Sequence, residues 1–133
     1  MSLTETLIHC IITVHKELGP GFLESVYRRA LVVELKRAGL FVEEEKEVFI
    51  YYCGQEVGRH KLDLVVETQL VVELKTVEDL NKAHYAQVRS YLKATGLTTG
   101  FLVNFSKEKS DFRRIDSTAS RCLAISPPSP PSL

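Results

Sequence analysis

Apolar residues recur every three or four positions in the first part of the chain, which is the spacing of one helical face. Ser2 and Glu5 match a capping box at the start of a helix, and Gly19-Pro20-Gly21 stops that helix and turns the chain. A second helix is expected over residues 23–38, with Gly39 at its C-terminal cap. The apolar positions of the two helices are Leu7, Ile11, Val14, Leu18, Val26, Tyr27, Ala30, Leu31 and Leu35.

The pattern then changes to short runs that indicate strands. Residues 41–52 contain alternating segments, residues 53–55 suit a hairpin turn, and a second strand is expected over residues 56–66. Leu70-Val71-Val72 is apolar at consecutive positions. The strand at residues 70–75 is therefore expected to be central, with both faces covered.

A third helix is expected to begin at residue 77 or 78 and to end at residue 95, before Gly96. Strands over residues 99–105 and 112–116 follow it. A strand, a helix and a further strand in this order predict a right-handed crossover between two parallel strands. The sequence thus predicts a single α/β domain over residues 1–118, with a mixed sheet flanked by helices. Residues 119–133, rich in proline and serine, are expected to form a flexible tail.

Composition narrows the class of protein. The chain has 133 residues, and 17 basic residues balance 17 acidic ones. This balance argues against a protein that coats nucleic acid through its net charge, but it permits an enzyme that meets phosphates at one local site. There is no apolar run of about 20 residues and no signal-peptide pattern, so we expect a cytoplasmic protein without membrane contact. Cys10, Cys53 and Cys122 lack metal-site spacing and are expected to be free thiols.

Two charged residues interrupt the apolar strand at residues 70–75. Glu73 and Lys75 are two positions apart, so their side chains share a face. Asp63 lies on the preceding strand, and a hairpin would bring its carboxylate beside that of Glu73. Adjacent carboxylates repel each other unless a cation lies between them, and oxygen ligands of this kind suit Mg²⁺ or Mn²⁺. The Leu74 carbonyl could add a ligand, and Lys75 could polarise a bound water. The alternative is a surface ion pair with an unrelated aspartate.

Further polar residues stand on the helices. Gln87 and Tyr91 interrupt the apolar stripe of the third helix, and Glu24 lies in the first turn of the second helix. The alternatives are that Tyr91 belongs to the core, that Gln87 is half exposed, and that the helix dipole alone favours Glu24. His60, three residues before Asp63, could approach the same site or could be an ordinary surface histidine.

Several of these motifs together resemble a known family. The segments GFLESVY at residues 21–27, D-x9-E-L-K from Asp63 to Lys75, Q-x3-Y from Gln87 to Tyr91, and GFLVNF at residues 100–105 are similar to the GxxExxY proteins of the PD-(D/E)XK nuclease superfamily. The resemblance covers about residues 7–115. It implies a restriction-endonuclease-like core of order α-β-β-β-α-β.

The resemblance also implies roles for the site residues. Glu24, Asp63 and Glu73 would hold Mg²⁺ or Mn²⁺. Asp63, Glu73 and Lys75, together with Gln87 and Tyr91 from the helix, would form the catalytic site.

The function expected from residues and resemblance is metal-dependent hydrolysis of phosphodiester bonds in DNA or RNA. The alternative is a non-catalytic module that keeps the nuclease fold and binds nucleic acid or protein. Family members often carry an arginine where this chain has Lys61, and no insertion suited to target recognition is present. The sequence leaves open whether the protein is a homodimer.

Overall fold

The chain forms its elements in the predicted order, α-α-β-β-β-α-β-β. The computed structural model describes residues 1–117, so the predicted tail at residues 119–133 and Cys122 lie outside the described residues. The elements are α1 (Leu3–Leu18), α2 (Glu24–Arg37), β1 (Val42–Tyr52), β2 (Gln55–Val66), β3 (Leu70–Lys75), α3 (Lys82–Thr95), β4 (Thr99–Asn104) and β5 (Asp111–Asp116).

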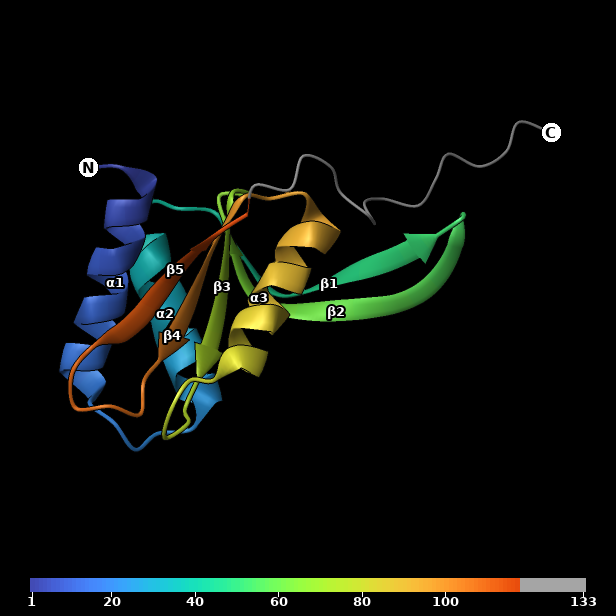
Figure 1. Cartoon of the computed structure of the whole chain (residues 1–133). Helices are drawn as coiled ribbons and strands as arrows, with labels where there is room; N and C mark the ends of the chain where they lie inside the picture. Colours follow the sequence, from blue (N-terminus) through green and yellow to red (C-terminus); the bar gives the residue numbers. More distant parts are fainter. Residues whose placement is uncertain (118–133) are drawn as a thin grey trace.

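The strands form one mixed sheet in the order β1-β2-β3-β4-β5 (Figure 1). Strands β3 and β4 are parallel, as the predicted crossover through α3 requires, and the other neighbours are antiparallel. From Leu70 to Leu74 every residue of β3 is buried. The prediction of a central strand covered on both faces is therefore confirmed.

Helices cover the two faces of the sheet in separate layers (Figure 1). Helices α1 and α2 pack on the face that carries Val72 and Leu74, while α3 packs on the face that carries Val71. Because side chains alternate along a strand, Glu73 and Lys75 share the α3 side with Val71. The Ser2 capping box is present, and Cys10 and Cys53 are free thiols, as predicted. Among residues 1–117, no helix has the length and hydropathy needed to cross a bilayer.

Strands β1 and β2 continue past the rest of the sheet as a two-stranded ribbon, here called the β1–β2 arm (Figure 1). Pairing between β2 and β3 ends at Leu64 opposite Val72, whereas β1 and β2 stay paired out to Tyr52 opposite Gln55. Leu62 packs in the α3 layer, although Leu64 packs in the α1–α2 layer. The strand therefore twists sharply at the residue between them, Asp63.

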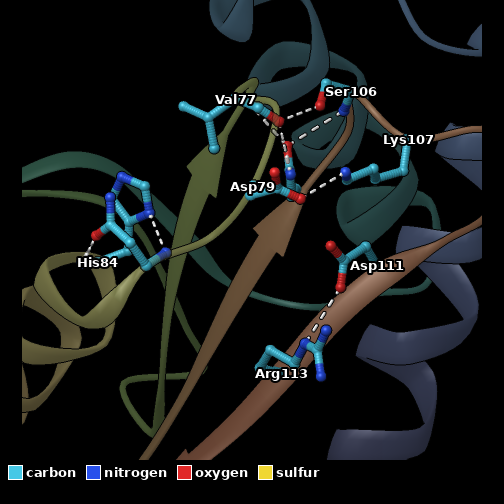
Figure 2. Close-up of polar contacts among 9 residues, drawn as sticks. Val77, Asp79, His84, Ser106, Lys107, Asp111 and Arg113 are labelled. Atoms are coloured by element: carbon cyan, nitrogen blue, oxygen red, sulfur yellow. Dashed lines mark hydrogen bonds and ion pairs between the residues drawn. The ribbon is translucent and has the colours of Figure 1, made fainter.

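Helix α3 begins at Lys82, so the predicted start at residue 77 or 78 is wrong. The segment before it is a loop because the buried side chain of Asn104 binds both backbone groups of Val77. Its Oδ1 accepts from the Val77 amide at 3.1 Å, and its Nδ2 donates to the Val77 carbonyl at 2.8 Å. Asn81 then caps the helix by accepting from the His84 amide at 3.1 Å. Figure 2 shows this loop joined to the segment that follows β4.

Gly100 is the point at which α3 approaches the sheet most tightly among the glycines of residues 1–117. A Cβ added there would lie 2.8 Å from Val88 Cγ1 and 3.4 Å from the Val71 carbonyl oxygen. Gly100→Ala should therefore lower the free energy of unfolding by about 1–3 kcal/mol through overpacking. Urea denaturation measures this loss. Gly58→Ala is the matched control, because the nearest atom to its added Cβ lies 3.9 Å away. Equal stability of the two variants would contradict the packing described here.

Candidate active site

Asp63 lies where β2 separates from β3. The next pair in the ladder would be Asp63 opposite Glu73, but β2 turns away after Leu64. The side chain of Asp63 replaces the backbone pairing that ends here, because Asp63 Oδ2 accepts a hydrogen bond from the Leu74 amide of β3 at 2.8 Å. The structure thus brings Asp63 next to the segment that carries Glu73 and Lys75.

Glu73 is a buried carboxylate, with only 5% of its surface exposed. Lys75 Nζ lies 3.3 Å from Glu73 Oε2. Within residues 1–117, Glu73 Oε1 is buried without any hydrogen-bond partner. Burial, followed by the charge of Asp63, raises the pKa of Glu73 from its ordinary 4.5 to about 8, although Lys75 opposes this shift. A buried carboxylate oxygen without a donor is costly and is well suited to a cation.

Glu24 is the first residue of α2. Burial raises its pKa, the negative charge of Asp63 raises it further, and Lys75 and Arg28 lower it. The Glu24 carboxylate is therefore within electrostatic reach of Asp63 and Lys75. The loop before it is held by Tyr27, whose hydroxyl donates to the Gly19 carbonyl and accepts from the Phe22 amide at 3.1 Å.

Tyr27 is itself fixed by the core. Its ring stacks on Phe105 with centroids 4.5 Å apart and planes 4° apart, and Tyr27 is fully buried. Phe105 follows the end of β4, and its amide donates to the Lys75 carbonyl at 2.9 Å. The start of α2 and the end of β3 are therefore tied to the same aromatic pair.

Helix α3 contributes Tyr91 and Gln87. Burial raises the pKa of Tyr91, and the charges of Glu73 and Asp63 raise it further, whereas a hydrogen bond with Gln87 lowers it. Tyr91 is buried and Gln87 is half buried. Tyr91 therefore belongs to the core, as one interpretation of the sequence expects, and its hydroxyl is within reach of Gln87 and of the charges of Glu73 and Asp63.

His60 contacts α3. Its ring lies edge-on to Tyr91 with centroids 4.8 Å apart, and its Nε2 is 3.2 Å from Ser90 Oγ. Burial lowers the pKa of His60. The ring therefore connects the base of the β1–β2 arm to the helix that carries Tyr91.

Sequence reasoning missed two groups of polar residues around the site. Asn104 is fully buried and lies opposite Lys75 in the parallel register. A single asparagine within the apolar strand at residues 100–105 was the signal that could have identified it. The other group is an ion-pair cluster of Arg28, Glu45 and Lys61. No spacing rule predicts that cluster, because its members come from three elements.

The donor set fits a divalent cation. The charge of Asp63 raises the pKa of both Glu24 and Glu73, and in the described chain one oxygen of Glu73 is buried without a donor. As the side chains stand, no group of three or more histidine, cysteine, aspartate or glutamate residues in the described chain is close enough to hold a metal ion. The Asp63 carboxylate turns to the Leu74 amide, and the free Glu73 oxygen remains. Two nearby oxygen ligands of this kind suit Mg²⁺ or Mn²⁺.

Comparison with known families identifies the superfamily of the chain. Residues 1–115 match the model of the PD-(D/E)XK nuclease superfamily. The chain belongs to the PD-(D/E)XK nuclease superfamily. The match includes every site residue described above and supports the predicted fold class. Membership of the GxxExxY group within the superfamily stays a resemblance.

A solved structure shares the superfamily fold. The crystal structure of SSO0001 superposes with a TM-score of 0.58 at 20% sequence identity, covering 73% of this chain and 52% of that one. The PD-(D/E)XK domain described here thus spans about half the length of SSO0001, and the likeness is one of fold. No curated protein matches the chain.

Proposed function

We propose that this PD-(D/E)XK domain is a metal-dependent nuclease that hydrolyses phosphodiester bonds in DNA or RNA. The observation that carries the proposal is the buried Glu73 carboxylate. One of its oxygens lacks a donor, and the other contacts the Lys75 ammonium. Burial of an acidic group beside a second carboxylate is costly for stability, and such arrangements are concentrated at functional sites.

In this proposal Asp63, Glu73 and Glu24 hold Mg²⁺ or Mn²⁺. When bound, the cation would lower the pKa of a water and offset negative charge on the phosphate. The raised pKa of Glu73 means that this carboxyl must lose its proton before it can bind a cation. The three side chains come from α2, β2 and β3, so the folded arrangement of all three elements is required.

Lys75 is the proposed catalytic cation. Its side chain is 18% exposed, so it can reach a substrate while its ammonium remains 3.3 Å from Glu73. From that position it can stabilise charge on the attacked phosphate or assist proton removal from water. Tyr91 and Gln87 are proposed to orient the carboxylates from α3, because their shared hydrogen bond fixes both side chains.

A non-catalytic binding module is the second candidate. The zero net charge and the lack of an insertion for target recognition favour it. Incubation of supercoiled plasmid, single-stranded DNA and single-stranded RNA with Mg²⁺ or Mn²⁺ separates the two candidates. Cleavage that EDTA abolishes supports the nuclease. Binding of these substrates without turnover would support the module.

Metal binding should stabilise the fold. Mn²⁺ or Mg²⁺ is expected to raise the melting temperature, because the cation binds the folded site and relieves carboxylate repulsion. Asp63→Asn should remove this gain. Differential scanning calorimetry measures both effects. Asp79→Asn is the charge-matched control, since Asp79 is exposed and pairs with Lys107. An equal metal response in wild type and Asp63→Asn would contradict the assignment.

The homodimer stays a prediction. Strand β1 lies at one edge of the sheet, and Val48 to Tyr52 of this strand carry no charge. An unpaired edge of this composition is a surface on which a second strand could pair. Analytical ultracentrifugation of the whole chain would measure the oligomeric state.

A further inference from the structure

The β1–β2 arm leaves the sheet beside the active site, and an ion-pair cluster marks this corner. Glu45 of β1 lies across from Asp63, between the pairs Glu44–Leu64 and Lys46–Leu62. Two cations contact the Glu45 carboxylate from different elements. Arg28 Nη2 of α2 lies 2.8 Å from Oε1, and Lys61 Nζ of β2 lies 2.7 Å from Oε2. Both carboxylate oxygens are therefore engaged by positive charge.

Each cation adjoins a proposed metal ligand. Arg28 lies one helical turn after Glu24 on the same face of α2, and Lys61 lies two residues before Asp63 on β2. The only anions that contact the Arg28 guanidinium in the described chain are Glu44 and Glu45. The cluster therefore places two cations next to the proposed site of hydrolysis, both held by a carboxylate of the protein itself.

Glu45 has an unfavourable backbone conformation. Its φ is 51°, in the left-handed region, which costs a residue with a side chain about 1–2 kcal/mol relative to the right-handed form. Glycine or asparagine would adopt this conformation more easily, yet the chain has a glutamate there. Strained residues of this kind are concentrated at functional sites and switch regions.

The Glu45 carboxylate is accessible to a competing anion. Its side chain is 40% exposed, and that of Lys61 is 62% exposed. The Arg28 side chain is only 13% exposed. The Lys61–Glu45 pair is exposed on both sides, and such pairs contribute little to stability, so a second anion can replace Glu45 at Lys61 at low cost. A phosphate offers arginine a planar pair of acceptors in the same way as a carboxylate does.

We propose that Arg28 and Lys61 form a binding subsite for a phosphate of the nucleic-acid backbone beside the cleaved bond, and that Glu45 occupies this subsite in the free protein. The identity of the anion rests on the proposed nuclease function. The substrate phosphate displaces the Glu45 carboxylate from the two cations when it binds. Glu45 thus acts as an internal competitor that weakens binding of nucleic acid.

The test compares Glu45→Gln with Glu47→Gln. Both changes remove one negative charge from β1, but no ion pair holds Glu47 in the described structure, although it lies opposite Lys61 in the ladder. Binding of a fluorescent single-stranded oligonucleotide is measured in EDTA, which prevents cleavage. Glu45→Gln should bind about five- to tenfold more tightly than Glu47→Gln. Its log–log salt dependence should steepen by about 0.7 for each cation released to a phosphate.

Two further variants show whether the gain depends on the cluster. Glu45→Asn also removes the charge and suits the left-handed conformation, so it should show the same gain even where glutamine disturbs the strand. Arg28→Gln combined with Glu45→Gln should abolish the gain. A gain that persists without Arg28 would overturn the proposal, as would equal affinities of the Glu45 and Glu47 variants.

Inorganic pyrophosphate in EDTA separates this proposal from the proposed function. It should raise the melting temperature of Glu45→Gln more than that of Glu47→Gln, and the difference should require Arg28. If this holds while no variant binds DNA or RNA, the anion subsite stands and the nuclease proposal fails. If nucleic acid binds equally to both variants and pyrophosphate does not distinguish them, the subsite is refuted, and the cleavage assay with Mg²⁺ or Mn²⁺ alone decides the nuclease proposal.

Discussion

Lys75→Ala is expected to lower the rate of phosphodiester cleavage by about 10²- to 10⁴-fold. The variant loses the ammonium that lies 3.3 Å from Glu73 and is partly exposed to substrate. Affinity for Mn²⁺ should be largely retained, because an ammonium is not a metal ligand. Lys75 lowers the pKa of Glu73, so removing it makes that carboxyl harder to ionise. Isothermal titration with Mn²⁺ should therefore be done at several pH values, so that a shift in the ionisation of Glu73 is separated from the loss of a metal ligand.

Three variants place this result in context. Glu73→Ala should lose both cleavage and Mn²⁺ binding, and Gln87→Ala should fall between the two, because its expected role is to orient the site from α3. Lys82→Ala removes an exposed lysine at the start of α3 and serves as the control. Equal turnover by wild type and Lys75→Ala would mean that another group or another protein performs the reaction. Retained binding without turnover by either would favour the non-catalytic module.

Glu73→Gln is expected to stabilise the metal-free protein at alkaline pH. The folded state raises the pKa of Glu73 from 4.5 to about 8, so folding favours the protonated carboxyl. The contribution of this group to stability is fully present below pH 4.5 and is lost as the pH rises through about 8. The loss is on the order of a few kcal/mol. Glutamine is neutral at every pH, so the variant should keep its stability over this window.

Urea denaturation in EDTA at pH 5 and pH 9 measures the difference. Wild type should lose stability between these values, and Glu73→Gln should lose less. Glu47→Gln, at an exposed position on β1, is the control and should follow wild type. Added Mn²⁺ should restore wild type at pH 9 and leave Glu73→Gln unchanged. Identical pH profiles in metal-free wild type and Glu73→Gln would show that folding does not raise the pKa of Glu73.

Local patterns determined most of the fold. Ser2 and Glu5 cap α1 as the sequence predicts, because a capping box involves only residues three positions apart. The consecutive apolar residues of β3 also predict its burial on both faces, because neighbouring residues of a strand point to opposite faces of the sheet. The period of two along that strand also predicts that Glu73 and Lys75 share one face. Short-range geometry is fixed by the chain itself, and the sequence therefore reveals it.

Helix α3 lacks the first turn that the sequence predicts, because a residue distant in sequence binds this segment. Residues 77–81 have a composition compatible with a helix, but Asn104, 27 positions after Val77, binds the Val77 backbone. Those hydrogen bonds replace the ones that a longer helix would make. A partner so distant in sequence leaves no periodic signal near the helix start.

The sequence by itself determined which residues carry the candidate chemistry, because the residue types and their spacing are local properties. Only the tertiary structure decided how strongly these residues influence one another. The raised pKa of Glu73 requires burial by α3 and a second carboxylate from β2. The contacts of Glu45 with Arg28 and Lys61 join side chains from α2, β1 and β2. Burial and electrostatic coupling depend on groups that are distant along the chain, so they arise only when the chain is folded.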